Sequence, residues 1–261
     1  MTLEISRAHA QLLVALRRAP SSPRFVIIGA AALKHHVLLP RTTADVDLAL
    51  VAEPEDIPAL LEPLGWHADG RRAQRWRDRE GHRVDVLPAT DRIIQAGSLL
   101  LDGGSSLSVQ GFDLALANTV LAHLPGEDEA VELASLGALV VLKMVAWMDR
   151  PYDRLRDLGD LARVLDHALD DTDERRWRPP LADLTFDEQS PFFVGREVAT
   201  IAQQSHLTLV RTFLARLQNE SPAWAATMAR EGGLAGRDPE SQMRLKLAAF
   251  ERGINEPPPP K

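Results

Sequence analysis

The chain has 261 residues, of which 45% are hydrophobic and 26% are charged, as is typical of a folded globular protein rather than a disordered or fibrous one. The 30 Lys and Arg residues against 37 Asp and Glu residues give a net charge of −7, which argues against indiscriminate binding to nucleic acid. The absence of cysteine excludes disulfides, thiolate zinc sites, iron–sulfur clusters and a cysteine nucleophile. The length predicts one large domain or, more readily, two.

The amino-terminal residues include an acid at Glu4 and lack the apolar stretch of a secretory signal peptide. No apolar run approaches the roughly 18 residues that are needed to span a bilayer. We therefore expect a cytoplasmic protein without a membrane partner.

Helical and extended patterns alternate in the first half of the chain. Apolar spacing predicts a helix over 4–18, and a β-branched run predicts a strand over 25–28 that ends at a glycine turn and a short helix. The other elements predicted here are a strand over 45–51, a helix over 56–64, a hairpin of strands over 73–77 and 82–87, and a strand near 107–112. These elements predict a small mixed sheet with flanking helices.

The second half of the chain is predicted to be helical. Helices are predicted over 136–148, 155–169, 194–217, 223–230 and 240–252. A charged stretch over 170–180 is interpreted as a solvated, extended connection, and the Pro-rich end is expected to be a disordered tail. The expected domains are an α/β domain over 1–132, a helical domain over 133–256 and the tail over 257–261.

Two carboxylates, Asp45 and Asp47, alternate with apolar residues in a predicted strand. Positions i and i+2 of a strand project to the same face, so the two are expected side by side while the opposite face packs into the core. Such a pair repels itself unless a cation lies between its members, and carboxylates are ligands that Mg²⁺ prefers. Asp85 repeats the pattern on another strand and predicts the third carboxylate of a two-metal site. The alternative is that Asp85 pairs with Arg83 or is exposed.

Segments in this order resemble the DNA polymerase β-like nucleotidyltransferase superfamily: residues 25–33 with their glycine turn, residues 41–48 with the paired acids, and residues 84–86 with the third acid. Lys143 and the segment 156–161 are similar to the Lys and Arg-Asp-x-x-Asp helices of the AbiEii (type IV toxin) group and related uncharacterised bacterial nucleotidyltransferases. The resemblance covers about residues 24–165. It implies an α+β fold, with a small mixed sheet and flanking helices followed by a helical C-terminal domain.

The resemblance also implies roles for the matched residues. The turn at Gly29 and Ala30 would open a helix whose backbone donors bind the triphosphate, and Arg41 in the following loop is a further candidate for phosphate. Lys143 would contact the triphosphate and Asp157 would orient it or a substrate hydroxyl. The alternative for Lys143 and Asp157 is an ion pair on a helix surface. Ala30 departs from the family pattern, which usually has Ser or Gly there.

A basic stretch over 71–83 holds six Arg against two acids. Arg75 and Arg77 alternate with Trp76, so one face of the strand is predicted to offer a phosphate-binding surface suited to RNA ends. The alternative is a solvated hairpin whose Trp76 packs into the core.

The leading prediction is a Mg²⁺-dependent, two-metal nucleotidyltransferase that moves a nucleoside monophosphate from an NTP such as ATP to an acceptor hydroxyl. The metal ligands would be Asp45, Asp47 and Asp85, and Lys143 and Asp157 would complete the catalytic set. If the toxin resemblance holds, the acceptor is an RNA 3′ end such as that of tRNA, and a cognate antitoxin is a partner. The alternatives are transfer to a small molecule such as an antibiotic, and a degenerate, non-catalytic fold that binds a nucleotide or a partner.

Overall fold

The computed structural model of the chain describes residues 2–19, 23–40, 42–70, 72–100, 106–220, 223–236 and 238–256. The chain divides into two compact units: a sheet unit of Met1–His35 with Pro40–Ser135, and a helical unit of His36–Leu39 with Leu136–Lys261. The expected domain boundaries at 132 and 256 stay a prediction. Arg41 and the Pro-rich end over 257–261 lie outside the described residues.

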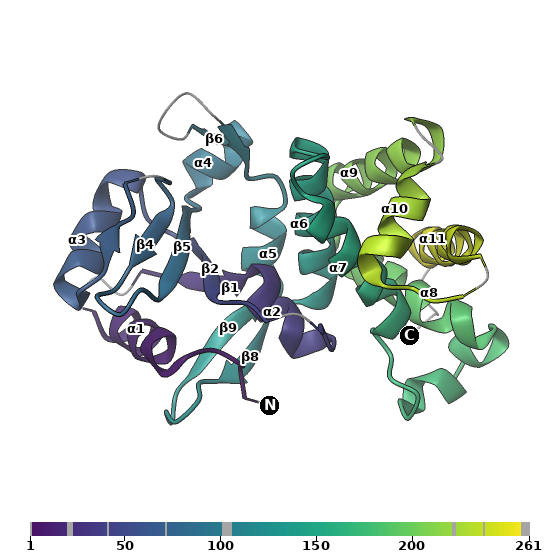
Figure 1. Cartoon of the computed structure of the whole chain (residues 1–261), viewed down its shortest axis with the longest axis horizontal. Coiled ribbons are helices and arrows are strands. Elements are labelled where there is room, and N and C mark those ends of the chain that lie inside the picture. Colours follow the sequence, from purple (N-terminus) through teal and green to yellow (C-terminus); the bar gives the residue numbers. More distant parts are fainter. Residues whose placement is uncertain are drawn as a thin grey trace. The chain divides into compact units, whose positions relative to one another are not determined.

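The sheet unit is built on a mixed sheet with the strand order β3-β4-β5-β2-β1-β9-β8 (Figure 1). Its strands are β1 (Phe25–Ile28), β2 (Asp45–Leu50), β3 (His67–Ala68), β4 (Arg75–Arg77), β5 (Arg83–Pro88), β8 (Thr119–His123) and β9 (Ala130–Ala134). β2 runs parallel to β5 and β1 runs parallel to β9, whereas the other neighbouring strands are antiparallel. A mixed sheet followed by helices confirms the predicted fold class.

The central strands differ in how they are buried. All four residues of β1 are buried, as expected of an apolar strand that is covered on both faces. In β2, Val46 and Leu48 are buried while Asp45 and Asp47 are half-buried. β5 alternates in the same way, so β2 and β5 share one core face and one charged face.

The helices of the sheet unit are α1 (Arg7–Arg18), α2 (Gly29–His36), α3 (Ile57–Leu61), α4 (Asp91–Ala96) and α5 (Phe112–Ala117). α1 begins at Ser6, whose hydroxyl oxygen accepts a hydrogen bond from the backbone N–H of His9. Arg17 and Arg18 in its last turn carry the charge that favours a helix C-terminus. The predicted helix over 56–64 is a short α-helix between two 3₁₀ turns.

One predicted strand is not part of the main sheet. β7 (Ser106–Ser108) pairs with β6 (Ser98–Leu100) in a separate two-stranded sheet. The prediction that a strand near 107–112 completes the main sheet is therefore wrong, and Phe112 already begins α5. β9 and β8 occupy that edge instead, and neither strand was predicted from the sequence.

The helical unit contains α6 (Leu136–Asp149), α7 (Leu155–His167), α8 (Phe186–Ile201), α9 (Gln204–Ala215), α10 (Ala223–Gly232) and α11 (Pro239–Asn255). The prediction of one continuous helix over 194–217 is wrong. Ala202 and Gln203 have extended backbone between α8 and α9, and the Gln203 and His206 side chains form a capping box that starts α9.

Two glycines allow α8 and α11 to approach closely. A Cβ added to Gly195 would lie 2.2 Å from the backbone oxygen of Phe250, and one added to Gly253 would lie 2.2 Å from that of Phe192. Any larger residue at either position would force the two helices apart.

The charged stretch over 170–180 is more ordered than an extended, solvated connection. Arg176 lies in a 3₁₀ turn over Glu174–Trp177 and is only 2% exposed. Its guanidinium donates to the backbone oxygens of Asp170 and Leu169 and to the side-chain oxygen of Gln189. The interpretation as a solvated linker is wrong for Arg176, because these acceptors compensate the loss of water.

Candidate active site

Strands β2, β5 and β4 bring charged side chains to one face of the sheet. The first row across these strands is Asp47, Asp85 and Arg75, which are register partners. The second row, two residues along each strand, is Asp45, Arg83 and Arg77. The structure thus places the three predicted metal ligands on one face, as the sequence predicted, but interleaves them with three arginines.

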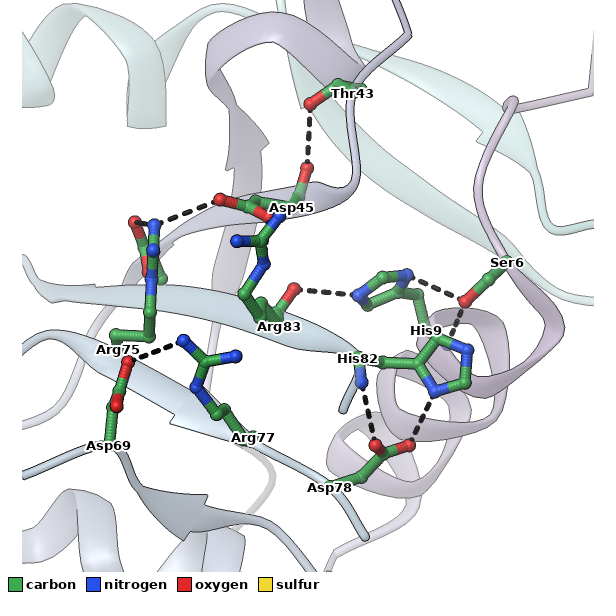
Figure 2. A network of polar contacts seen from close by, with 11 residues as sticks. Ser6, His9, Thr43, Asp45, Asp69, Arg75, Arg77, Asp78, His82 and Arg83 are labelled. Carbon is green, nitrogen blue, oxygen red and sulfur yellow. Dashed lines mark hydrogen bonds and ion pairs between the residues drawn. The ribbon is translucent and has the colours of Figure 1, made fainter. Parts of the chain in front are cut away.

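Arg75 bridges two of the three carboxylates. Its Nε lies 2.7 Å from Asp85 Oδ1, and its Nη2 lies 2.8 Å from Asp85 Oδ2 and 2.9 Å from Asp45 Oδ2. Arg83 Nε is 2.6 Å from the other oxygen of Asp45, so Asp45 lies between two guanidinium groups (Figure 2). The hydrogen bond to Asp85 raises the pKa of Arg75 above its ordinary value. Both oxygens of Asp45 and of Asp85 therefore face positive charge.

Asp47 lies against Gly29, the first residue of α2. Gly29 has a φ of +69°, and a Cβ added to it would lie 2.0 Å from Asp47 Oδ2. Only glycine permits both this backbone conformation and this close approach. The carboxylate is thus held beside the start of α2, where backbone N–H groups favour anions. Ala30 follows in α2, is 8% exposed and adds no hydroxyl.

The chemistry of Asp45 and Asp47 suits a magnesium ion. Mg²⁺ usually binds through one or two carboxylates and completes its shell with water and substrate phosphates. Two aspartates on one strand face, with one of them beside the Gly29 turn, fit that requirement. Within the part of the chain that the structure describes, no group of three or more His, Asp or Glu side chains is arranged to hold a metal. The role of Asp85 as a third ligand stays a prediction.

His9 of α1 supports β5 where that strand enters the charged face. Its Nε2 lies 2.7 Å from the backbone oxygen of Arg83, so Nε2 carries the proton and Nδ1 accepts from the hydroxyl of Ser6 at 2.8 Å (Figure 2). Burial lowers the pKa of His9 below its ordinary value. A neutral imidazole therefore links α1 to β5.

The helical unit places Lys143 of α6 against Asp157 and Asp160 of α7. Lys143 Nζ lies 2.6 Å from Asp157 Oδ1 and 2.7 Å from Asp160 Oδ2. Burial by itself lowers the pKa of Lys143, but the two carboxylates outweigh it and raise the pKa above the ordinary value. The alternative of a pair on a helix surface is wrong in one respect, because Lys143 and both carboxylates are buried. The predicted triphosphate contact of Lys143 and the predicted orienting role of Asp157 stay predictions.

Two ion pairs of the structure were not predicted from the sequence. They join Arg75 to Asp85, which both alternate with apolar residues on neighbouring strands, and Lys143 to Asp160. The i, i+3 spacing of the two acids on α7 was the available signal for the second pair. Trp76 is buried, which confirms the alternative that this side chain packs into the core.

A mixed sheet with paired aspartates beside a glycine turn at a helix start indicates the nucleotidyltransferase class. A family model described as the nucleotidyl transferase AbiEii toxin of type IV toxin–antitoxin systems matches residues 11–235. The chain therefore belongs to the AbiEii family of nucleotidyltransferases, as the resemblance implied.

Solved structures and curated proteins were also compared with this chain. The crystal structure of a "putative nucleotidyltransferase from H. pylori" is similar at 10% sequence identity and a TM-score of 0.37, covering 94% of this chain and 93% of that chain. Curated proteins give no match. In the described ranges, no helix is both long and apolar enough to cross a membrane.

Proposed function

We infer that this chain transfers a nucleoside monophosphate from an NTP to an acceptor hydroxyl in a Mg²⁺-dependent reaction. The observation that carries the proposal is the pair Asp45 and Asp47 on one face of β2, with Asp47 held against Gly29 at the start of α2. Membership of a nucleotidyltransferase family supports an NTP as the substrate.

The proposed chemistry assigns each group a task. Asp45 and Asp47 would hold Mg²⁺, which neutralises phosphate charge and makes the acceptor hydroxyl a better nucleophile. The backbone N–H groups of Gly29 and Ala30 would bind the triphosphate. The hydroxyl oxygen attacks the α-phosphorus, the bond from that phosphorus to the β-phosphate oxygen breaks, pyrophosphate leaves, and the hydroxyl proton passes to a carboxylate or to water. Asp85 contributes the third carboxylate of this face.

Residues beyond the charged face complete the proposal. Arg41, in the loop before β2, would contact phosphate. Lys143 would contact the triphosphate, and Asp157 would orient Lys143 or a substrate hydroxyl.

The proposed acceptor is the 3′ end of an RNA such as tRNA, with a cognate antitoxin as a protein partner. The match to a family of type IV toxins supports both parts of this proposal. Arg77 adds positive charge beside the site, because it lies on the same strand face as Arg75.

Two observations favour a second candidate, a nucleotide-binding protein without catalysis. Asp45 and Asp85 are both paired with arginine, and Ala30 lacks the hydroxyl that the family pattern usually supplies. Such a protein would bind an NTP and transfer nothing.

The decisive experiment incubates the full chain with Mg²⁺, total RNA and each NTP labelled on its α-phosphate. We expect labelled RNA, and a loss of at least about 100-fold in rate for Asp47→Asn. Asp69→Asn is the matched control, because Asp69 is another carboxylate of the sheet unit that pairs with arginine, here Arg77 at 2.9 Å. NTP binding without transfer to RNA would overturn the proposal in favour of the non-catalytic protein. In a parallel assay with a cell extract in place of the RNA, label on a small molecule would instead support the antibiotic-type reaction.

A further inference from the structure

Arg75 and Asp85 form an ion pair between two neighbouring strands of the sheet. The two residues are register partners on neighbouring antiparallel strands, and two parallel hydrogen bonds of 2.7 and 2.8 Å join the guanidinium to the carboxylate. This bidentate geometry is the strongest arrangement available to an arginine and a carboxylate. Only 10% of the Arg75 side chain and 13% of the Asp85 side chain are exposed.

Both oxygens of Asp85 therefore face a guanidinium group. To bind a divalent cation, it would have to break a nearly buried ion pair and leave Arg75 without its main partner, which is strongly unfavourable. Asp45 is held more loosely, since its side chain is 25% exposed against 13% for Asp85. Its two oxygens also contact two different arginines, Arg75 and Arg83, rather than one guanidinium in bidentate geometry. The two carboxylates thus differ in how easily they can accept a metal ion.

The guanidinium of Arg75 lies between Asp85 and Asp45, two of the three carboxylates predicted to hold the cations of a two-metal site. Nη2 contacts an oxygen of each, at 2.8 and 2.9 Å. A guanidinium carries a permanent positive charge and further donors, so it can stabilise negative charge on a phosphate oxygen without a metal.

We propose that Arg75 replaces one of the two divalent cations, so that this chain binds a single divalent ion, on Asp45 and Asp47. Asp85 is then a positioning residue that acts through Arg75 and is not a metal ligand. This inference rests on the proposed function, because it specifies how the same charged face works.

The same strand supplies a control for the charge of Arg75. Arg77 lies two residues along β4 on the same face, but its ion pair is with Asp69, and 41% of its side chain is exposed. Arg77→Gln removes an arginine from the charged face and leaves Arg75 in contact with Asp45 and Asp85.

The test counts the Mn²⁺ ions bound per chain by electron paramagnetic resonance, with no nucleotide present. We expect one ion for the native chain and for Arg77→Gln. Arg75→Gln should bind two, because Asp85 is released beside Asp45. The double variant Arg75→Gln/Asp85→Asn conserves the net charge, leaves no unpaired carboxylate at Asp85, and should return to one ion.

The double variant also separates a positioning role from a merely structural one. With its Mn²⁺ count unchanged, its transfer rate should still fall by about 100-fold, because the fixed charge is lost. Two ions on the native chain, or fewer ions on the double variant than on the native chain, would overturn the inference and leave the proposed function standing. A native chain that binds no Mn²⁺ and transfers no nucleotide would overturn both.

Discussion

Two clusters in this chain share one pattern, in which a cation bridges two carboxylates, yet they differ in their surroundings. In the helical unit, the side chains of Lys143, Asp157 and Asp160 are 11%, 9% and 5% exposed. In the sheet unit, Arg75 is equally enclosed, but Asp45 keeps 25% of its side chain in contact with solvent. Burial decides what each cluster can do, because an enclosed charge is costly to separate from its partner and an accessible one can meet a ligand.

This difference suggests opposite outcomes for substitutions in the two regions. Loss of the cation in the enclosed cluster should lower the free energy of unfolding. Changes on the sheet face should mainly alter metal binding and transfer.

Removal of the Lys143 ammonium tests the enclosed cluster. Lys143→Met should lower the free energy of unfolding by about 3–5 kcal/mol, because Asp157 and Asp160 are left buried without their shared cation. Urea unfolding followed by circular dichroism measures this loss.

Lys246→Met is the matched control for Lys143. Lys246 is as deeply buried, but its partner Asp166, at 2.8 Å, is 28% exposed and can be solvated when the lysine is removed. Lys246→Met is therefore expected to lower the free energy of unfolding by less than Lys143→Met does. If Lys143→Met is as stable as the native chain, the contrast between the clusters is wrong. A loss of NTP binding in that variant would support the proposed triphosphate contact of Lys143 in either case.

Gly29→Ala tests the close approach of Asp47 on the sheet face. Gly97, the C-cap of α4, has nearly the same φ (+72° against +69°), but nothing lies within 4 Å of its missing Cβ. Gly97→Ala should cost about 1–2 kcal/mol for the left-handed backbone alone. Gly29→Ala should cost more, because its Cβ must also displace the carboxylate of Asp47, and it alone should reduce Mn²⁺ binding. Equal effects of the two variants on unfolding and on Mn²⁺ binding would show that the contact with Asp47 is unimportant.

The pH dependence of stability tests the support that His9 gives to β5. The pKa of His9 is lowered in the folded chain, so below about pH 6.5 the unfolded chain takes up the proton first and stability falls as the pH falls. His9→Gln does not titrate and should remove this part of the loss between pH 7 and 5, an effect of about 1 kcal/mol or less. Unfolding midpoints measured across that range check it, and a native profile identical in slope to that of His9→Gln would contradict the buried, neutral imidazole.

Much of the fold follows from local patterns that the sequence displays. Long apolar periods predicted α6 and α7, and the alternation of acid and apolar residues predicted β2 and its charged face. The errors arose where tertiary contacts decided the structure. β8 and β9 form by pairing with each other and with β1, and the break between α8 and α9 depends on a side-chain cap at Gln203.

The residue types and their spacing already define the groups available at this site: no thiol, paired aspartates at strand spacing, a glycine before a helix and a cluster of arginines. Which of these charges contact one another depends on the folded structure. The register of β2, β5 and β4 brings Asp45 and Asp85 into contact with Arg75. Along the chain, Asp45 is 30 residues from Arg75 and Asp85 is 10 residues from it. Ion pairing depends on distance and burial rather than on order along the chain. The residue types therefore suggested a metal site, but they could not show that an arginine lies between two of its predicted ligands.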